Sequence, residues 1–176
     1  MSKPKPIFSL EILYKMCYDL KKEGKKIGFT HGAFDLFHFS HLDLLKKSEA
    51  ICDFLIVGIE SDEHVETYKS YKRPIVDEKS RTSIIGELNC VDAVFVNDLP
   101  LNSQTYTYLY KELHVDCVTI GNEFQYEDIM QEQVLRAGSD LVKLNPVRLY
   151  STTSLISSII RKYTKNDLED VPKSDY

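Results

Sequence analysis

The chain has 176 residues, of which 43% are hydrophobic, and this is enough for one domain with a sizeable core. Its formal net charge of -5 argues against broad binding to nucleic acid or to anionic membranes, so an anionic substrate must meet a local cluster of positive charge. No apolar run approaches the roughly 20 residues that a membrane span requires, and the N-terminus lacks the features of a secretory signal. The four cysteines lie far apart in apolar surroundings, which is typical of a reducing compartment, and we expect a cytoplasmic protein.

Helix-like and strand-like segments alternate along the chain. Residues 9–24 have apolar side chains at helical spacing, between Ser9 as a suitable N-cap and Gly24 as a suitable stop. Residues 53–59 form a near-continuous apolar run, which is typical of a strand buried on both faces of a parallel sheet. In chain order, the predicted elements are a helix over 9–24, a strand over 26–30, a helix over 38–51, a strand over 53–59, helices over 62–69 and 78–90, a strand over 93–97, a helix over 104–113, a strand over 117–121, a helix over 127–138, a strand over 140–144 and a helix over 151–163.

This alternation predicts an α/β fold, in which an open parallel sheet of five strands carries helices on both faces. We expect one domain over residues 1–163, followed by a charged tail over 164–176. In such sheets, ligands bind beyond the carboxyl ends of the strands. The segments that follow the predicted strands are 31–41, 60–62, 98–103, 121–124 and 145–153.

The most unusual of these places is the stretch GFTHGAFDLFHFSH at 28–41, which joins a predicted strand to a predicted helix. Gly32 allows the backbone to turn, or to approach a ligand without a Cβ clash. The first turn of the helix offers unpaired N–H groups, which bind phosphates readily. His38 and His41 share one helical face, where two ring donors could stabilise a phosphoryl group. On spacing alone, a capping role for His38 and a core role for His41 are favoured, and a zinc site is poorly supported.

The same stretch resembles the signature G-x-F-D-x-x-H-x-G-H of the cytidylyltransferase-like nucleotidyltransferases, with Ser40 in place of the family's last glycine. The resemblance covers roughly residues 9–160 and is closest to the adenylyltransferase domain of heptose-phosphate enzymes, which have asparagine where this chain has His31. It implies a single Rossmann-like nucleotidyltransferase domain. Such a domain transfers a nucleoside monophosphate from a nucleoside triphosphate to a sugar phosphate and releases pyrophosphate.

The resemblance also implies the site residues. Lys69 matches a phosphate-side lysine, Arg81 an arginine ahead of a V-D pair, and residues 150–156 a phosphate-binding STT segment. Without the resemblance, the basic run around Lys69 is typical of a solvated loop, Arg81 could pair with Glu78, and the STT residues would cap a helix in any case. The implied catalytic residues are His38, His41, Lys69 and Arg81, and the implied nucleotide-binding residues are Thr30, His31, Gly32, Ala33, Phe34, Asp35, Arg73, Gly121, Asn122, Glu123, Ser151, Thr152 and Thr153.

The implied chemistry needs no protein nucleophile, because a phosphate monoester is already mostly dianionic, with a second pKa of about 6. Catalysis then rests on positioning and on stabilisation of charge. We expect Mg²⁺ as the cofactor, carried by the triphosphate and not by a dedicated protein metal site. The expected partners are ATP or CTP and a phosphorylated small molecule, with no nucleic acid or membrane, and the family suggests a homodimer.

Several alternatives stay open at this stage. A CTP-dependent enzyme acting on glycerol phosphate or a similar polyol phosphate is the first, since the segment GNEF at 121–124 departs from the G-G-D-Y of the heptose-type enzymes. A nucleotide-binding module without catalysis and a protein-interaction domain are the others. Tyr106, Tyr108 and Tyr110 are expected to face solvent on two sides of a helix, and no function is assigned to them.

Overall fold

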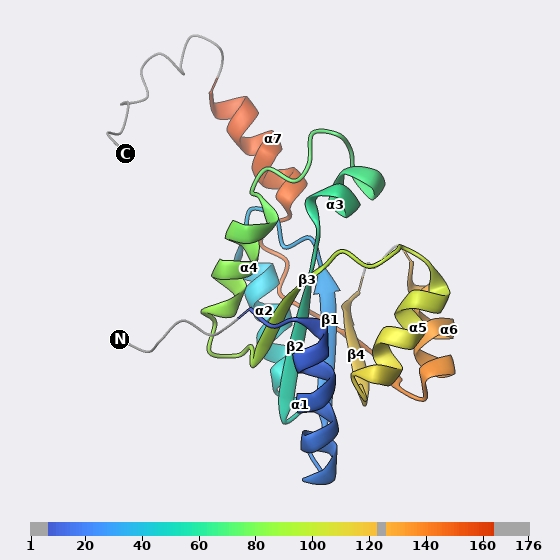
Figure 1. Ribbon diagram of the computed structural model, residues 1–176. Coiled ribbons are helices and arrows are strands. Elements are labelled where there is room, and N and C mark those ends of the chain that lie inside the picture. Colours follow the sequence, from blue (N-terminus) through green and yellow to red (C-terminus); the bar gives the residue numbers. More distant parts are fainter. Residues whose placement is uncertain (1–6, 123–125, 164–176) are drawn as a thin grey trace.

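The structure is a computed structural model that describes residues 7–122 and 126–163. It contains one parallel sheet in the order β3-β2-β1-β4-β5, surrounded by helices (Figure 1). The predicted α/β fold with five parallel strands is confirmed. The elements are α1 (Leu10–Lys22), β1 (Ile27–Gly32), α2 (Phe39–Glu49), β2 (Phe54–Glu60), α3 (Asp62–Tyr68), α4 (Glu78–Gly86), β3 (Ala93–Asn97), α5 (Ser103–Glu112), β4 (Cys117–Gly121), α6 (Glu127–Ala137), β5 (Asp140–Leu144) and α7 (Thr152–Lys162).

Two hydrophobic layers flank the sheet because side chains alternate between its faces along each strand. On one face, Phe29 of β1 packs with residues of α1, α5 and α6. On the other face, Leu55 and Val57 of β2 pack with Leu45 of α2 and Ile85 of α4. The predicted placement of helices on both faces is therefore confirmed, and α1 and α5 share one of those faces.

Helix α5 has one solvent-exposed side, not two. Tyr106 and Tyr110 are buried in the core, at 6% and 0% exposure, whereas Tyr108 is 57% exposed. The expectation that all three tyrosines face solvent is therefore wrong. Residues at positions 106 and 110 are four apart and lie on the same face of a helix, so tertiary packing against the sheet decides their burial.

A crevice opens at the carboxyl ends of β1 and β4. The two strands pair only at Gly28 with Cys117 and at Phe29 with Val118, although β1 continues to Gly32. This is also the point at which the strand order reverses, which is where sheets of this kind bind ligands.

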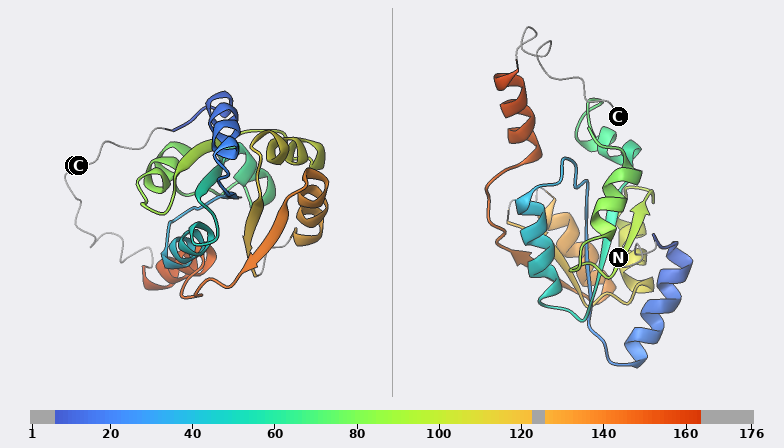
Figure 2. Two further views of the ribbon diagram at one scale, coloured as in Figure 1. Left: turned by 90° about the horizontal axis from the view of Figure 1, so that it is seen from below. Right: turned by 90° about the vertical axis from the view of Figure 1, so that its left-hand side faces the viewer.

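Helix α7 begins beside this crevice and extends away from the sheet (Figure 2). None of its residues is buried. No helix within the described residues is both long and apolar enough to cross a membrane.

Candidate active site

The loop between β1 and α2 follows a strained course. Phe34 and Leu36 have positive φ angles of 48° and 46°, a conformation that non-glycine residues seldom adopt and that clusters at functional sites. Gly32 was the residue expected to turn the chain, but it lies in β1 and is not among the residues with positive φ. The turn therefore begins after Gly32. A Cβ added at Gly32 would make ordinary van der Waals contact with the ring of Phe34, at 3.6 Å, so the position itself does not demand glycine.

Asp35 ties this loop to the segment between α3 and α4. Its buried carboxylate accepts hydrogen bonds from Nε of Arg73 at 2.6 Å and from the backbone N–H groups of Ile75 and Val76 at 3.0 Å. Burial by itself would raise the pKa of this carboxyl, but the two backbone donors and Arg73 hold the pKa below its usual value. The carboxylate is therefore ionised, and it fixes the Arg73 side chain beside the loop.

His38 and His41 stack on each other at the start of α2, with ring centroids 3.8 Å apart and ring planes at 21°. His38 is the N-cap residue, but its side chain makes no capping hydrogen bond, so the capping role suggested by spacing is wrong. Both ring nitrogens of His38 and Nδ1 of His41 are buried without a hydrogen-bond partner among the described residues.

The electrostatic state of this pair follows from its burial. Desolvation lowers the pKa of His38, and desolvation together with repulsion from His38 lowers the pKa of His41 to about 3. Both rings are therefore mostly neutral at pH 7, and each carries an N–H group. Buried donors without acceptors are rare in folded proteins, and a bound anion would supply the missing acceptors.

The start of α7 closes the opposite side of the loop. Ser151 caps this helix through a capping box. The hydroxyl of Thr152 donates to the carbonyl of Asp35 at 2.8 Å, and the hydroxyl of Ser40 donates to the carbonyl of Tyr150 at 3.0 Å. Ser40, which replaces the family's glycine, thus joins α2 to the segment that leads into α7. The helix start and the histidine pair are held together by these two hydrogen bonds.

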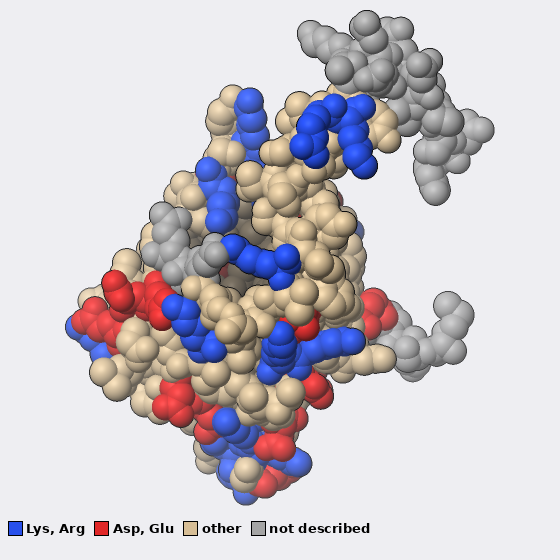
Figure 3. Space-filling model, turned by 180° about the vertical axis from the view of Figure 1, so that it is seen from behind, with Lys and Arg blue, Asp and Glu red and all other residues tan. Residues whose placement is uncertain are grey.

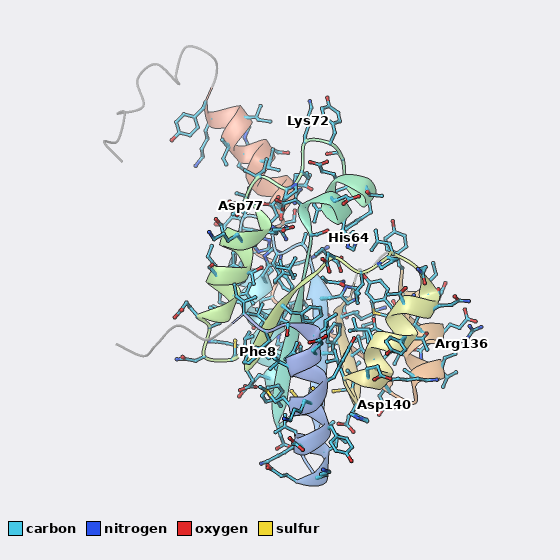
Figure 4. The ribbon with its side chains drawn as sticks, in the orientation of Figure 1. Phe8, His64, Lys72, Asp77, Arg136 and Asp140 are labelled. Atoms are coloured by element: carbon cyan, nitrogen blue, oxygen red, sulfur yellow. The ribbon has the colours of Figure 1, made fainter. Side chains whose placement is uncertain are left out.

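A cavity of about 870 Å³ lies between the loop, the carboxyl ends of the strands and the start of α7. Figure 3 shows a hollow on this face with lysine and arginine side chains around it. Lys69, Arg73 and Arg148 line the cavity, whereas Lys72 points away from the body of the protein (Figure 4). The predicted site residues that line it are His31, Gly32, Ala33, Phe34, Asp35, His38, His41, Lys69, Arg73, Gly121, Asn122, Ser151, Thr152 and Thr153.

Three predicted site residues are not placed there. Glu123 lies outside the described residues. Thr30 is 1% exposed, and its hydroxyl donates to the carbonyl of Thr119 at 3.0 Å, just beyond the last paired residues of β1 and β4. Its role is to join the two strands at the point where their backbones separate.

Arg81 is also absent from the cavity wall, in contrast to the expectation from the resemblance. Its side chain is 1% exposed, and its guanidinium donates to the carbonyl oxygens of Val76, Ala33 and Glu60. A further hydrogen bond of 2.7 Å reaches the carboxylate of Asp62. Each nitrogen of the guanidinium thus has a protein acceptor. Arg81 therefore stabilises the backbone around the loop and does not face the cavity.

Glu60 and Tyr106 are among the cavity-lining residues to which sequence reasoning gave no role, although Glu60 lies in the predicted strand-end segment 60–62. Glu60 is the last residue of β2 and is 3% exposed. A signal for it existed, because a charged residue directly follows an apolar strand, and such strand ends point toward the ligand crevice. Tyr106 had no such signal, since its spacing in the sequence does not tell which side of α5 meets the sheet.

Comparison with known proteins agrees with this geometry. Residues 29–163 match the model of a family described as cytidylyltransferase-like. The chain belongs to the cytidylyltransferase-like family. The matched span contains the histidine pair, the cation-lined loop and the start of α7, so the cytidylyltransferase-like domain includes the whole described cavity.

Curated relatives of this cytidylyltransferase-like domain include two that are named bifunctional protein HldE. The protein from Nitrobacter hamburgensis is 35% identical over 139 residues, which cover 77% of this chain and 27% of the relative. The protein from Helicobacter pylori is 35% identical over 163 residues, which cover 88% of this chain and 32% of the relative. The chain thus spans about a third or less of the length of these relatives.

Two solved structures resemble the domain. A lipopolysaccharide core biosynthesis protein from Thermoplasma volcanium GSS1 has a TM-score of 0.61 and 26% identity, covering 71% of this chain and all of that one. A pantoate-beta-alanine ligase from Francisella tularensis has a TM-score of 0.58 with 16% identity, covering 95% of this chain and 78% of that one, and shows likeness of fold alone.

Proposed function

We propose that this domain transfers a nucleoside monophosphate from a nucleoside triphosphate to a sugar phosphate, and that it is an adenylyltransferase of the heptose-phosphate type. The observation that carries the proposal is the histidine pair. His38 and His41 present buried ring nitrogens, which have no hydrogen-bond partner within residues 7–122 and 126–163, to a cavity that Lys69 and Arg73 also line. This combination of unpaired donors and cations suits a triphosphate.

The geometry supports catalysis by positioning and by charge stabilisation. An oxygen of the acceptor phosphate attacks the α-phosphorus in line. The bond from that phosphorus to the β-phosphate oxygen breaks, and pyrophosphate leaves with the electron pair. Neutral His38 and His41 donate N–H hydrogen bonds to the α-phosphate oxygens as charge develops there, and Lys69 and Arg73 neutralise the departing pyrophosphate.

Mg²⁺ belongs to this proposal as a companion of the triphosphate. Among the described residues, the carboxylates that line the cavity are those of Asp35 and Glu60, and both accept hydrogen bonds from protein donors. The donor set therefore fits an ion held by triphosphate oxygens and water, where it would neutralise negative charge on the leaving group.

Two observations support a heptose phosphate as the acceptor. Proteins named HldE are 35% identical over most of this chain, and residues 9–160 resemble heptose-phosphate adenylyltransferase domains. A CTP-dependent enzyme that acts on a polyol phosphate is the second candidate. We also place the protein in the cytoplasm, because its cysteines are free within the described residues and the reaction consumes nucleoside triphosphate.

The first test is thermal stability of the purified chain with Mg²⁺ and ATP, CTP, GTP or UTP in turn. We expect ATP to raise the melting temperature most, because a ligand that binds only the folded state stabilises it. A larger shift with CTP would favour the second candidate. No shift with any of the four would contradict nucleotide binding itself.

The second test is turnover of His41→Ala, measured as pyrophosphate release with ATP and a heptose phosphate. Loss of a contact made mainly in the transition state should lower kcat by about 100-fold or more and leave nucleotide affinity within about threefold. His114→Ala, a change of an exposed histidine in the turn that follows α5 and outside the cavity lining, is the matched control. Parental turnover in His41→Ala would remove the proposed role of the pair.

A further inference from the structure

Helix α2 holds the connection between β5 and α7, residues 145–151, to which the proposed mechanism gives no role. This β5–α7 connection belongs to no helix or strand, so its backbone N–H and carbonyl groups need partners elsewhere. Figure 2 shows it running alongside α2 before α7 begins. Most of its residues line the cavity, namely Asn145, Pro146, Arg148, Tyr150 and Ser151. The connection is therefore one wall of the cavity, and its attachment to α2 determines where that wall lies.

Ser40 makes the first of three contacts between α2 and this wall. Its hydroxyl donates to the carbonyl of Tyr150 at 3.0 Å, and the residue is 9% exposed. Ser40 lies in the first turn of α2, between His38 and His41 in the sequence. The glycine that the family signature has at this place carries no hydroxyl and could not make the bond. In this chain, one end of the wall is thus attached to the turn that carries the histidine pair.

Asp43 and Lys47 make the other two contacts. They follow Ser40 at spacings of three and four residues, so all three side chains share one face of α2. Oδ2 of Asp43 accepts hydrogen bonds from the backbone N–H of Val147 at 2.6 Å and from Nζ of Lys47 at 2.7 Å. The same Nζ donates to the carbonyl of Asn145 at 2.6 Å. The hydrogen bonds from Lys47 and Val147 hold the pKa of Asp43 below its usual value, so this contact is made by an ionised pair.

The two ends of the β5–α7 connection meet other parts of the cavity. Near its start, Cγ of Pro146 lies 3.7 Å from the place that a Cβ of Gly121 would take, at the end of β4. Just beyond its end, the hydroxyl of Thr152 donates to the carbonyl of Asp35. Between these points, Arg148 brings a cationic residue to the cavity wall. A shift of the connection would therefore move Arg148 and the first turn of α7 relative to the histidine pair.

We propose that Ser40, Asp43 and Lys47 are positioning residues for the nucleotide, because through the β5–α7 connection they fix the cavity wall that a bound triphosphate meets. The inference rests on the proposed function, since it takes the ligand to be a nucleoside triphosphate. A wall that is already ordered in the free protein loses less entropy when the ligand binds, which raises affinity. This gain applies equally to the bound substrate and to the transition state, so its loss should weaken ATP binding and leave kcat nearly unchanged.

The first experiment compares Ser40→Ala with Ser48→Ala by calorimetry with ATP and Mg²⁺. Ser40→Ala should raise Kd for ATP about tenfold, because the wall must then be ordered on binding. Ser48→Ala is the matched control on the same helix, since the buried hydroxyl of Ser48 bonds with the carbonyl of Leu44 and the hydroxyl of Thr119 and not with the connection. Its Kd should stay within about twofold of the parent's. Parental affinity in Ser40→Ala, or an equal loss in both variants, would overturn the inference.

The division between binding and turnover separates this role from that of the histidine pair. In Ser40→Ala, kcat for pyrophosphate release with ATP and a heptose phosphate should stay within about threefold of the parent's. A large fall in kcat with unchanged Kd for ATP would mean that the substitution disturbs the neighbouring His41, and it would overturn the inference. Calorimetry needs no acceptor, so the affinity test does not depend on which sugar phosphate is used.

A pair of lysines tests the other end of the contact. Lys47→Met removes the donor to the carbonyl of Asn145 and should raise Kd for ATP about fivefold. Lys46→Met removes the same charge from the neighbouring, exposed residue of α2, and its Kd should stay within about twofold of the parent's. Equal weakening by both variants would mean that only the charge of α2 matters, and it would overturn the positioning role of Lys47.

Hydrogen exchange of the Val147 amide reads the position of the wall without any activity measurement. In the absence of nucleotide, Ser40→Ala should make this exchange about fivefold faster and Ser48→Ala should not change it. Equal exchange in Ser40→Ala and the parent would overturn the inference. ATP binding by the parent that Ser40→Ala matches would contradict the inference alone, whereas failure of the parent to bind any nucleotide would contradict the proposed function along with it.

Discussion

At the scale of single residues, the neutral histidine pair predicts how stability depends on pH. The folded-state pKa of His41 is about 3, against an ordinary value of 6.5. Between these two pH values, His41 is protonated in the unfolded chain and neutral in the folded protein. The stability that depends on neutral His41 is fully present above pH 6.5 and is lost as the pH falls toward the folded-state pKa. We expect the parent to lose about 1 kcal/mol of unfolding free energy per pH unit through His41 between pH 6 and 4.

Urea denaturation at several pH values, compared between the parent and His41→Asn, measures this contribution. The variant lacks the group that titrates, so its unfolding free energy should fall less steeply over the same range. Carboxylates that do not interact with His41, such as Glu60, titrate in both proteins and cancel in the difference. Parallel pH profiles would show that His41 accepts a proton in the folded state as easily as in the unfolded chain.

Arg81 gives the second prediction at this scale. Its guanidinium donates hydrogen bonds to carbonyl groups of three segments and to the carboxylate of Asp62. Because lysine would leave some of these acceptors unpaired, Arg81→Lys should lower the free energy of unfolding by about 3 kcal/mol. Arg136→Lys on α6 is the control. Its partner Glu132 and the arginine itself are about 60% exposed, so that change should stay within about 0.5 kcal/mol. Normal stability of Arg81→Lys with weakened ATP binding would instead support the phosphate contact that the resemblance implies.

At the scale of elements, the start of α7 depends on hydrogen bonds from outside the helix. Thr152→Val removes the hydroxyl that donates to the carbonyl of Asp35 and keeps the shape of the side chain. The amide of Leu155 bonds to the carbonyl of Ser151 in the first turn, and its hydrogen exchange should become about fivefold faster, the equivalent of roughly 1 kcal/mol. Thr67→Val on α3 is the control, because its exposed hydroxyl bonds only within its own helix. Equal exchange at Leu155 in both variants and the parent would show that this bond does not hold the helix.

The limits of sequence prediction are clearest at this same scale. Periodicity placed every strand and helix to within a few residues, because an apolar run such as β2 is compatible with few structures in a parallel sheet. The rule on strand ends and the resemblance together placed His38 and His41 at the cavity. Arg81 and Thr30 do not line the cavity, since whether a side chain faces a cavity or supports the backbone depends on neighbours distant in sequence. The strand-end rule included Glu60 in the segment 60–62, but its contacts with His31 and His64 depend on such neighbours as well.

At the scale of the whole molecule, the described residues explain how a chain of net charge -5 can bind a polyanion. Lysine and arginine side chains gather around the hollow, while acidic side chains lie on other parts of the same view (Figure 3). The two carboxylates at the cavity wall are neutralised or occupied by hydrogen bonds, one by Arg73 and one by His31 and His64. Lys69 and Arg148 therefore add positive charge to the cavity wall despite the overall charge.

Helix α7 gives the last prediction at this scale. It has 11 residues, none of them buried, and a short helix with so little packing is marginal in water. Ile159 and Ile160 are 52% and 68% exposed near its end. The family resemblance suggests a homodimer, and we expect a second copy of the chain to cover these two side chains. Sedimentation equilibrium should then show a dimer for the parent and a monomer for Ile160→Glu, since a charge in an apolar interface is strongly unfavourable. Leu135→Glu is the control, because Leu135 on α6 is 71% exposed and lies outside α7, and it should remain dimeric. A parent that sediments as a monomer, or a dimer that survives Ile160→Glu, would contradict this assignment and leave the exposed end of α7 to a different partner.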